Sequence, residues 1–286
     1  MEIISEVKTE RDCCVKISVV IPVYGFGELT DRCIDACKKN AGIEHDILVV
    51  DDCSDTSYEN PNAATIRIKE RSGCTKALNI GLRALRLNYD YVLLLNNDTI
   101  PQPDFLKNLV ECAESDKGIG IVASTRINSW DPYREAGPGM DLTTGLVRYE
   151  KSPDDWKGPI QCIWTPFCSV LFSRACVEYV GLLDEKLINH CQDNDYCLRA
   201  VFMGFGIVVE PRSKVFHYQS VTIHSLNIEP YDDQITFARK WFGPAHNQIL
   251  NAIPINYELR KYGVMGFRYE IRDTDVGDEK RIILAK

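Results

Sequence analysis

Tyr89-Asp90-Tyr91-Val92-Leu93-Leu94-Leu95-Asn96-Asn97-Asp98 is a segment in which an apolar run passes directly into three polar residues. The run over residues 91–95 predicts a strand buried on both faces of a parallel sheet. Open α/β sheets bind their ligands at the carboxyl ends of such strands. Amide and carboxylate oxygens at this position suit a hard cation and, through it, a phosphate. The alternative is a polar turn that caps the next helix, since Thr99-Ile100-Pro101 follows and Pro suits a first helical turn.

Further strands and helices alternate around this segment. Runs rich in β-branched residues predict strands over residues 16–23, 46–52, 65–68 and 119–123. Apolar residues at helical spacing predict helices around residues 29–37, 75–87 and 105–110. This alternation predicts an α/β fold with a doubly wound, mostly parallel central sheet.

The pattern changes in the second half of the chain. From about Thr125 to Gln161, Pro and Gly residues predict loops and short irregular pieces. An apolar stretch over 162–172 follows, and then come helices near 173–180 and from 190 to 201, and strands over 207–209 and 215–217. The residues after Pro244 carry no recognisable motif.

Composition excludes several classes of protein. The chain has 286 residues and a net charge of −8, which argues against a general nucleic-acid binder. No stretch approaches the length of an apolar transmembrane helix. The N-terminal residues 1–6 are acidic and lack the layout of a signal peptide.

The twelve cysteines are scattered, with no Cys-x-x-Cys pair and no Cys/His quartet. Cys33, Cys37 and Cys112 fall in helical patterns and are expected to act as small buried apolar residues. We therefore predict reduced thiols and a cytoplasmic protein without a structural zinc site.

Several motifs occur in order at plausible spacing. They are residues 18–24, residues 49–55, Gly73 with Asn79 and Gly81, residues 94–98, 183–185, 192–199 and 217–220, and Lys240-Trp241-Phe242-Gly243. Together these motifs resemble family 2 glycosyltransferases of the GT-A fold, in the subgroup with rhamnosyl- and galactofuranosyl-transferase-like enzymes. They extend from Lys16 to Gly243, about four fifths of the chain.

The resemblance implies an organisation and an activity. Residues 14–125 would bind the nucleotide-sugar, 126–243 would form a smaller acceptor-binding and catalytic half of the same GT-A domain, and 244–286 would be an extension of unknown role. The activity implied is inverting, metal-dependent transfer of a hexose or deoxyhexose in polysaccharide biosynthesis. The donor would be a UDP-, dTDP- or GDP-linked sugar, the cofactor Mn²⁺ or Mg²⁺, and the acceptor a glycan, a glycolipid or lipid-linked glycan, or a protein. Peripheral contact with a membrane is left open.

The same resemblance implies a donor site. Its expected nucleotide-sugar contacts are Pro22, Tyr24, Asp51, Asp52, Gly73, Asn79, Asn96 and Asn97. A carboxylate such as Asp51 or Asp52 can accept from the imide N–H of uracil or thymine, or from ribose hydroxyls. Both acids could instead cap a turn, and the sequence does not decide which of them reads the base.

Asp98 is the expected metal ligand, and the resemblance adds His217, whose neutral imidazole is a competent ligand. The family has an acid where this chain has Asn96, so one negative charge is lost at the cation. Trp164, Phe167 and Cys168 lie where the acceptor pocket should begin, although they could equally be core residues.

Asp193 is the expected general base, since an ordinary Asp is ionised at neutral pH. The family usually has Glu-Asp where this chain has Gln192-Asp193. These acids could instead cap a helix, with Asp195 and Arg199 as an i, i+4 ion pair. Two other functions remain: a nucleotidyltransferase, although the segment Gly25-Phe26-Gly27-Glu28 lacks a basic phosphate loop, and an inactive sugar- or nucleotide-binding module.

Overall fold

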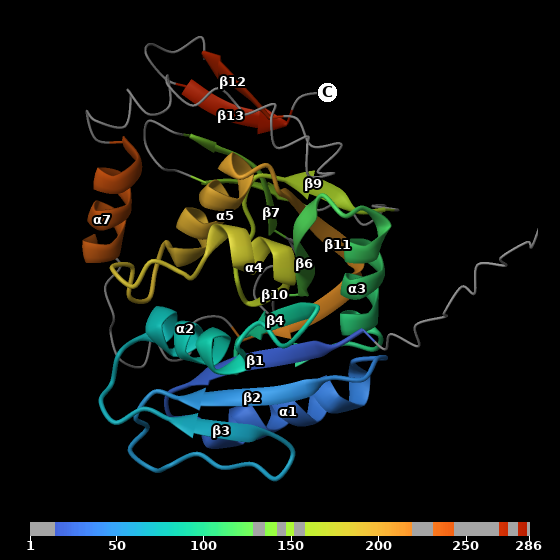
Figure 1. Cartoon of the computed structure of the whole chain (residues 1–286), viewed down its shortest axis with the longest axis vertical. Coiled ribbons are helices and arrows are strands. Elements are labelled where there is room, and N and C mark those ends of the chain that lie inside the picture. Colours follow the sequence, from blue (N-terminus) through green and yellow to red (C-terminus); the bar gives the residue numbers. More distant parts are fainter. Residues whose placement is uncertain are drawn as a thin grey trace, which may run out of the picture.

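A nine-stranded sheet lies at the centre of the computed structural model, which describes residues 15–127, 135–141, 147–151, 158–218, 231–242, 269–273 and 280–284 (Figure 1). The strand order is β3-β2-β1-β4-β10-β6-β11-β5, and β9 pairs with β11 outside this path. The strands are β1 (Ile17–Val23), β2 (Asp46–Asp51), β3 (Ala64–Arg67), β4 (Tyr91–Leu95), β5 (Thr99–Pro101), β6 (Ile119–Ile127), β9 (Ile160–Cys162), β10 (Ser169–Ser173) and β11 (Gly206–His217).

Most of these strands run in one direction. β1 is parallel to β2 and β4, β2 is parallel to β3, and β6 is parallel to β11. β10 lies antiparallel between β4 and β6, so β4 and β6 point the same way. Only the short β5 and β9 join β10 in the opposite direction. The predicted α/β fold with a mostly parallel sheet is therefore confirmed.

Helices cover both faces of the sheet (Figure 1). α1 (Gly27–Asn40) and α3 (Phe105–Ser115) pack on one face, and α2 (Cys74–Leu85), α4 (Arg174–Val180) and α5 (Gln192–Phe202) pack on the other. α7 (Tyr231–Phe242) is bonded to α5. Two hydrophobic cores result, one on each side of the sheet.

β4 is buried on both faces, as its sequence predicted. Val92 and Leu94 belong to the core under α2 and α5, and Tyr91, Leu93 and Leu95 belong to the core under α1 and α3. None of the five side chains is more than 5% exposed, and each contributes roughly 1.5–3 kcal/mol through burial.

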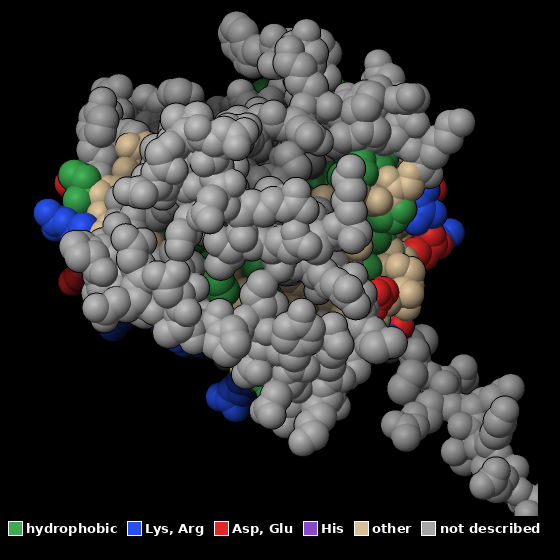
Figure 2. Space-filling model, turned by 90° about the horizontal axis from the view of Figure 1, so that it is seen from above, with side chains coloured by type: hydrophobic (Ala, Val, Ile, Leu, Met, Phe, Trp, Pro, Cys, Tyr) green, Lys and Arg blue, Asp and Glu red, His purple; other side chains and the backbone are tan. Residues whose placement is uncertain are grey.

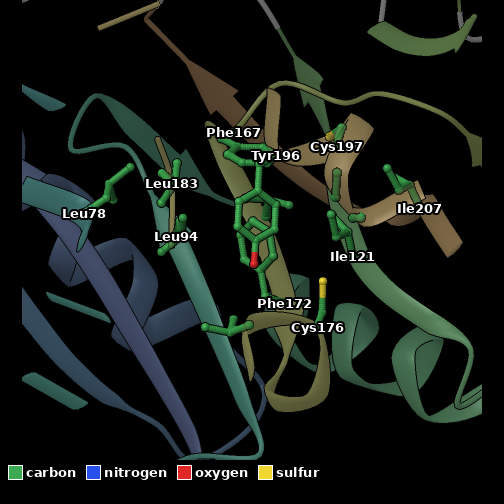
Figure 3. Packing of buried hydrophobic residues seen from close by; sticks show 14 of the residues in the cluster. Leu78, Leu94, Ile121, Phe167, Phe172, Cys176, Leu183, Tyr196, Cys197 and Ile207 are labelled. Atoms are coloured by element: carbon green, nitrogen blue, oxygen red, sulfur yellow. The ribbon is translucent and has the colours of Figure 1, made fainter. Parts of the chain in front are cut away.

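The core under α5 is rich in aromatic rings (Figure 3). Tyr196 of α5 meets Phe172 of β10 edge to face, with ring centroids 5.0 Å apart. Across the same core, α2 approaches the sheet closely at Gly81, where a Cβ atom would collide with Val20 of β1. This packing holds α2 and α5 against the same face of the sheet.

The alternative of a helix-capping turn after β4 is wrong. Residues 99–101 form β5, which pairs with residues 215–217 of β11, and the next helix begins only at Phe105. These residues form a strand and not a turn because β11 supplies hydrogen-bond partners for their backbone N–H and C=O groups. The strands predicted over 207–209 and 215–217 are likewise one strand, interrupted by a register shift between Glu210 and Lys214.

The expectation of loops and irregular pieces between 125 and 161 is wrong for residues 135–141 and 147–151, whereas residues 128–134, 142–146 and 152–157 lie outside the described residues. β7 (Glu135–Asp141) and β8 (Val147–Lys151) form an antiparallel pair, and a register shift between Ala136 and Gly139 accommodates Pro138. β12 (Tyr269–Asp273) and β13 (Lys280–Leu284) add to it in the order β12-β13-β7-β8. The C-terminal segment thus supplies strands to a second sheet, a long-range pairing that no local motif announces.

Within the described ranges, no helix combines the length and the apolar character needed to cross a membrane. The charged side chains visible in Figure 2 are of both signs. The expectation about a signal peptide falls on residues 1–6, which lie outside the described residues.

The ten cysteines in the described part of the chain are all free, and most are buried. Cys13 and Cys14 lie outside that part. Burial raises the pKa of several of these thiols, for example those of Cys162 and Cys176 to about 12. Such thiols stay protonated at neutral pH and are poor nucleophiles.

Thiol titration under denaturing, non-reducing conditions is expected to find close to twelve free thiols in protein isolated from its native host. The folded protein should expose few of them, because burial shields the sulfur atoms. A matched sample reduced before denaturation serves as the control. Several disulfides in the unreduced sample would contradict the cytoplasmic prediction.

Candidate active site

The predicted site residues gather at the carboxyl edge of the sheet. Asp51 ends β2, His217 ends β11, and Asn96 follows β4 directly. Parallel strands deliver their carboxyl ends to a common edge, which is where open α/β sheets place ligands. The first turns of α2 and α5 face the same edge, as their contacts show below.

Asp98 and His217 form the centre of the expected metal site. The carboxylate Oδ1 of Asp98 lies 3.0 Å from Nε2 of His217, and both side chains are buried. The side-chain amide of Asn96 lies 3.4 Å from the same imidazole nitrogen. The backbone N–H of Tyr218 donates to the carbonyl of Asp98 at 2.9 Å and so joins the two segments.

The charge on His217 follows from its surroundings. Burial lowers the pKa of the imidazole, but Cys168 and Asp98 raise it, and the net result is a pKa of about 9. At neutral pH a protonated His217 therefore pairs with the Asp98 carboxylate.

These donors suit a divalent cation in part. One carboxylate, one amide oxygen and one imidazole nitrogen that has lost its proton can hold Mn²⁺ or Mg²⁺ if other oxygens complete the coordination. Among the described residues, no group of three or more His, Cys, Asp or Glu side chains is arranged to hold a metal ion. A cation here would thus depend on ligand oxygens such as those of a diphosphate.

Asn97 has a different place from its neighbours. Its side-chain amide donates to Oγ1 of the buried Thr30 on α1 at 3.0 Å. Asn97 therefore ties the strand tip to α1, and this bond uses its amide N–H away from the Asp98–His217 pair.

Both carboxylate oxygens of Asp51 accept hydrogen bonds from other residues of the protein. Its oxygens accept from the backbone N–H groups of Ser54 and Tyr58, at 2.9 and 3.1 Å, and from the guanidinium of Arg67. Burial raises the pKa of this carboxyl, but those hydrogen bonds outweigh it and the net shift is downward. Asp51 shapes the loop after β2, a role that matches the turn-capping alternative.

Asp52 holds the corner before α2. Its Oδ1 accepts from the backbone N–H and the hydroxyl of Ser72, at 2.7 and 2.8 Å, and its Oδ2 accepts from the N–H of Gly73 at 2.8 Å. Gly73 has a φ of +89°, and a Cβ atom there would collide with Ile188. Only glycine suits this corner.

The ring of Tyr24, directly after β1, makes a cation–π contact with the side chain of Arg71. The guanidinium carbon of Arg71 lies 4.3 Å from the ring centroid. Pro22 precedes Tyr24 in β1 and pairs with Val50. An aromatic ring and a guanidinium plane together form a surface on which a base can stack.

Asn79 is a structural residue in this fold. Its side chain exchanges hydrogen bonds with the backbone of Leu183, at 2.9 and 3.0 Å, and donates to Glu185 at 3.0 Å. It is 0% exposed. The expected contact of Asn79 with the nucleotide-sugar therefore has no support in the geometry: burial and these bonds assign it to the turn at Leu183.

Asp193, in the first turn of α5, is the expected base. Burial raises the pKa of its carboxyl to about 6, although hydrogen bonds and the Arg126 charge oppose that rise. A carboxylate with a pKa near neutrality is better suited to proton transfer than the ordinary Asp that the sequence predicted.

Trp164 and Cys168 lie on opposite sides of the sheet core. Trp164 is buried in the core under α5, and its indole N–H is among the groups that lower the pKa of Asp193. Cys168 is buried in the other core and acts on His217. Phe167 packs on Phe172 with centroids 5.1 Å apart. The core alternative thus describes all three, two of them in contact with the site.

Asp195 has the structural role that the sequence analysis gave as an alternative, an ion pair with Arg199 within α5. Its Oδ2 accepts from Nε of Arg199 at 2.8 Å, which confirms the i, i+4 ion pair. Its Oδ1 accepts from Trp241 Nε1 at 2.8 Å and from Lys240 Nζ at 2.6 Å. Both donors belong to the Lys-Trp motif of α7.

Three acids of the predicted site influence the pKa of the Cys74 thiol. Burial raises the pKa of its thiol to about 12, and the charges of Asp52, Asp98 and Asp193 add to the rise. All three carboxylates therefore lie within electrostatic reach of the first residue of α2. They come from segments more than forty residues apart along the chain.

Sequence reasoning missed the basic residues of the site. Arg67, Arg71 and the buried Arg126 all act on predicted site residues. Arg67 and Arg71 could have been found from the sequence, because they are two basic residues that precede Gly73 while the other charged residues predicted for the site are mostly acidic. Arg126 had no such signal, because its charge acts on Asp193 from a distant segment of the chain.

The chain is similar to known glycosyltransferases. The sequence profile of Glycosyl transferase family 2 matches residues 18–179. The dTDP-rhamnosyl transferase RfbF of Shigella flexneri is 24% identical over 167 residues, which are 57% of this chain and 55% of that protein. The chain thus spans about half the length of this curated relative.

Two solved structures share the fold. GalNAc-T7, solved with UDP, GalNAc and Mn²⁺, superposes with a TM-score of 0.63 at 17% identity, over 88% of this chain and 54% of that one. S. aureus TarS superposes with a TM-score of 0.53 at 16% identity, over 85% of this chain and 46% of that one. The expected GT-A fold is confirmed. Because the family profile matches more than half of the sequence, the chain belongs to glycosyl transferase family 2.

Proposed function

We propose that this chain is an inverting, metal-dependent glycosyltransferase that moves a sugar from a nucleoside-diphosphate sugar to an acceptor hydroxyl. The observation that supports it best is the buried Asp98–His217 pair at the carboxyl edge of the sheet, with Oδ1 and Nε2 3.0 Å apart. At this edge, Asp52 and Gly73 would form the donor corner, Asp98 would hold the cation and Asp193 would act as the base.

The donor would lie along the carboxyl edge of the sheet. Tyr24 and Arg71 offer a stacking surface for its base. The relative named as a dTDP-rhamnosyl transferase and the neighbour solved with UDP support a nucleotide-sugar donor. UDP-, dTDP- and GDP-sugars are the candidates.

Asp98, the amide oxygen of Asn96, and His217 after the cation displaces its Nε2 proton would hold Mn²⁺ or Mg²⁺, as the Mn²⁺ of the GalNAc-T7 structure supports. The cation would neutralise charge on the leaving diphosphate. With one carboxylate in the ligand set, cation and nucleotide should bind together better than either binds alone.

Asp193 would accept the proton of the acceptor hydroxyl. The hydroxyl oxygen forms a bond to the anomeric carbon while the bond from that carbon to the diphosphate oxygen breaks, and the nucleoside diphosphate leaves with the electron pair. A single displacement with one base gives inversion of the anomeric configuration. We propose a glycan, a lipid-linked glycan or a protein as the acceptor and the cytoplasm as the compartment, the latter supported by the free thiols of the described residues.

Replacement of Asp98 with Asn should weaken nucleotide binding by removing the charged cation ligand. In titrations with UDP, dTDP and GDP, the wild type should bind at least one of them about tenfold more tightly with Mn²⁺ than with chelator, a gain of about 1.4 kcal/mol. The variant should bind weakly in both conditions. Asp35→Asn, an exposed acid on α1, is the control and should behave as the wild type. Equal affinity in all four combinations of wild type, Asp98→Asn, metal and chelator would show that the metal assignment is wrong.

Asp193→Asn should reduce sugar transfer by about 10²–10⁴-fold, the usual contribution of a general base. Donor affinity should stay within a few fold, because the donor ligands are on other segments. Asp35→Asn, the exposed acid on α1, is the control and should keep wild-type transfer, whereas Asp195→Asn should lower Tm, since Asp195 is bonded to Arg199, Lys240 and Trp241. Near wild-type transfer by Asp193→Asn would exclude Asp193 as the base, and retention of configuration would exclude a single displacement.

The pH dependence of kcat/KM should show an acidic limb near pH 6. The carboxyl of Asp193 has a pKa raised to about 6, so it loses its capacity to accept a proton as pH falls through that value. The stability of the fold changes with pH in the opposite direction. The folded chain holds this proton more tightly than the unfolded chain does, so ionisation destabilises the fold as pH rises from about 4 towards 6. Asp193→Asn should therefore have an unchanged or higher Tm at pH 8, and a clearly lower Tm would contradict the burial argument.

A further inference from the structure

One carboxylate on α7 holds the segment that precedes the base. Asp233 is 6% exposed, and its oxygens accept from three successive backbone N–H groups. The donors are Ile188 at 2.9 Å, Asn189 at 2.8 Å and His190 at 2.8 Å. Bonds from several N–H groups to one charged carboxylate are stronger and shorter than neutral ones.

The same segment also caps α2. The carbonyl of Ile188 accepts from the N–H of Thr75 at 3.1 Å, and the side-chain oxygen of Asn189 accepts from the N–H of Cys74 at 3.1 Å. Gly73, at the N-cap position, has no side chain for this task. The segment 188–190 therefore connects the donor corner at Gly73 with α7.

A second anchor of α7 lies just beyond the base. Near the end of α7, Trp241 and Lys240 donate to Oδ1 of Asp195, and the Trp241 ring stacks on Phe202 with centroids 5.6 Å apart. Asp193 thus lies between two points that α7 holds, His190 before it and Asp195 after it.

The local sequence does not fix the start of α5 by itself. Its N-cap residue, Cys191, has a φ of +61° and makes no side-chain capping bond. A residue other than glycine adopts this left-handed conformation only when its surroundings enforce it. Here the surroundings are the bonds from α7 and α2.

We propose that Asp233 is a positioning residue, which through residues 188–190 and the start of α5 fixes Asp193 relative to the donor corner at Gly73. This inference rests on the proposed function. Asp233 touches neither donor nor acceptor. Its effect is on the distance between the acceptor hydroxyl and the carboxylate of Asp193. Misplacement by about 1 Å can lower a rate by about 10²-fold.

Asp233→Asn tests this role, because its amide keeps the shape but replaces one acceptor oxygen with an NH2 group, so that at least one of the three N–H donors loses its partner. We expect kcat per folded molecule to fall by about 10- to 100-fold, while the affinity for UDP with Mn²⁺ stays within threefold. The acidic limb of the pH profile should also move below pH 6, because a loosened α5 start exposes Asp193 to water. Asp232→Asn, an exposed acid beside it on α7, is the matched control and should match the wild type in all three measurements.

Trp241→Phe provides a second variant, which keeps the ring stack but removes the N–H donor to Asp195, and it should change the three measurements in the same directions. A purely stabilising role of α7 predicts instead a lower Tm with unchanged kcat per folded molecule and an unchanged acidic limb. That result in both variants would overturn the proposal. An equal loss of UDP affinity and of kcat would also overturn it, because the disturbance would then include the whole site.

Hydrogen exchange separates this inference from the proposed function. Asp233→Asn should speed amide exchange over residues 188–195, including the first turn of α5, relative to Asp232→Asn. Faster exchange limited to residues 188–190 would contradict the positioning role. A wild-type chain that turns over none of the nucleotide-sugars would contradict the proposed function, and the exchange comparison would still decide whether Asp233 fixes the start of α5.

Discussion

Burial of β4 on both faces is the constraint on which the rest of the structure depends. Its five side chains belong alternately to the two cores, and they leave no polar face to the strand. The polar residues 96–98 must therefore lie at the edge of the sheet, beside the ends of β1, β2 and β11. Residues that are distant in sequence meet there because neighbouring parallel strands end at the same edge.

Much of the polar chemistry at this edge holds the protein together. Asp51 and Asp52 bond to loop N–H groups, Asn79 to Leu183, and Asn97 to Thr30. Among the predicted site residues, the Asp98–His217 pair and Asp193 remain the candidates for contact with a ligand. A motif of a binding site thus contains residues that contact the ligand and residues that shape the loops around it, and the sequence pattern is the same for both.

Opposite environments tune the two titratable groups at the centre of the site. The contacts of His217 with Cys168 and Asp98 outweigh its burial and raise its pKa to about 9, so that it carries a charge at neutral pH. Burial raises the pKa of Asp193 to about 6, which places it near the value that a general base needs. Pairs of groups shifted by their surroundings in this way are typical of functional sites.

The sequence by itself determined the fold class and the strand ends that carry the site. Hydrophobic alternation and apolar runs have a local cause, burial on one or two faces, and they are visible residue by residue. Thus β1, β2, β4 and the helices of the first half were predicted, as were Asp98, His217 and Asp193 as candidates and the pair of Asp195 with Arg199. Their roles in metal binding and catalysis remain predictions.

Only the tertiary structure decided the rest. β5 pairs with β11 and β13 pairs with β7, which are distant in the sequence, while β8 and β12 pair with their neighbours β7 and β13, so residues that favour turns or carry no motif became strands. In the same way, the raised pKa of Asp193, the burial of Asn79 and the hold of Asp233 on residues 188–190 depend on elements that approach from elsewhere in the chain. A sequence pattern records what each residue prefers, whereas pKa, burial and hydrogen-bond partners depend on which distant groups the fold brings near.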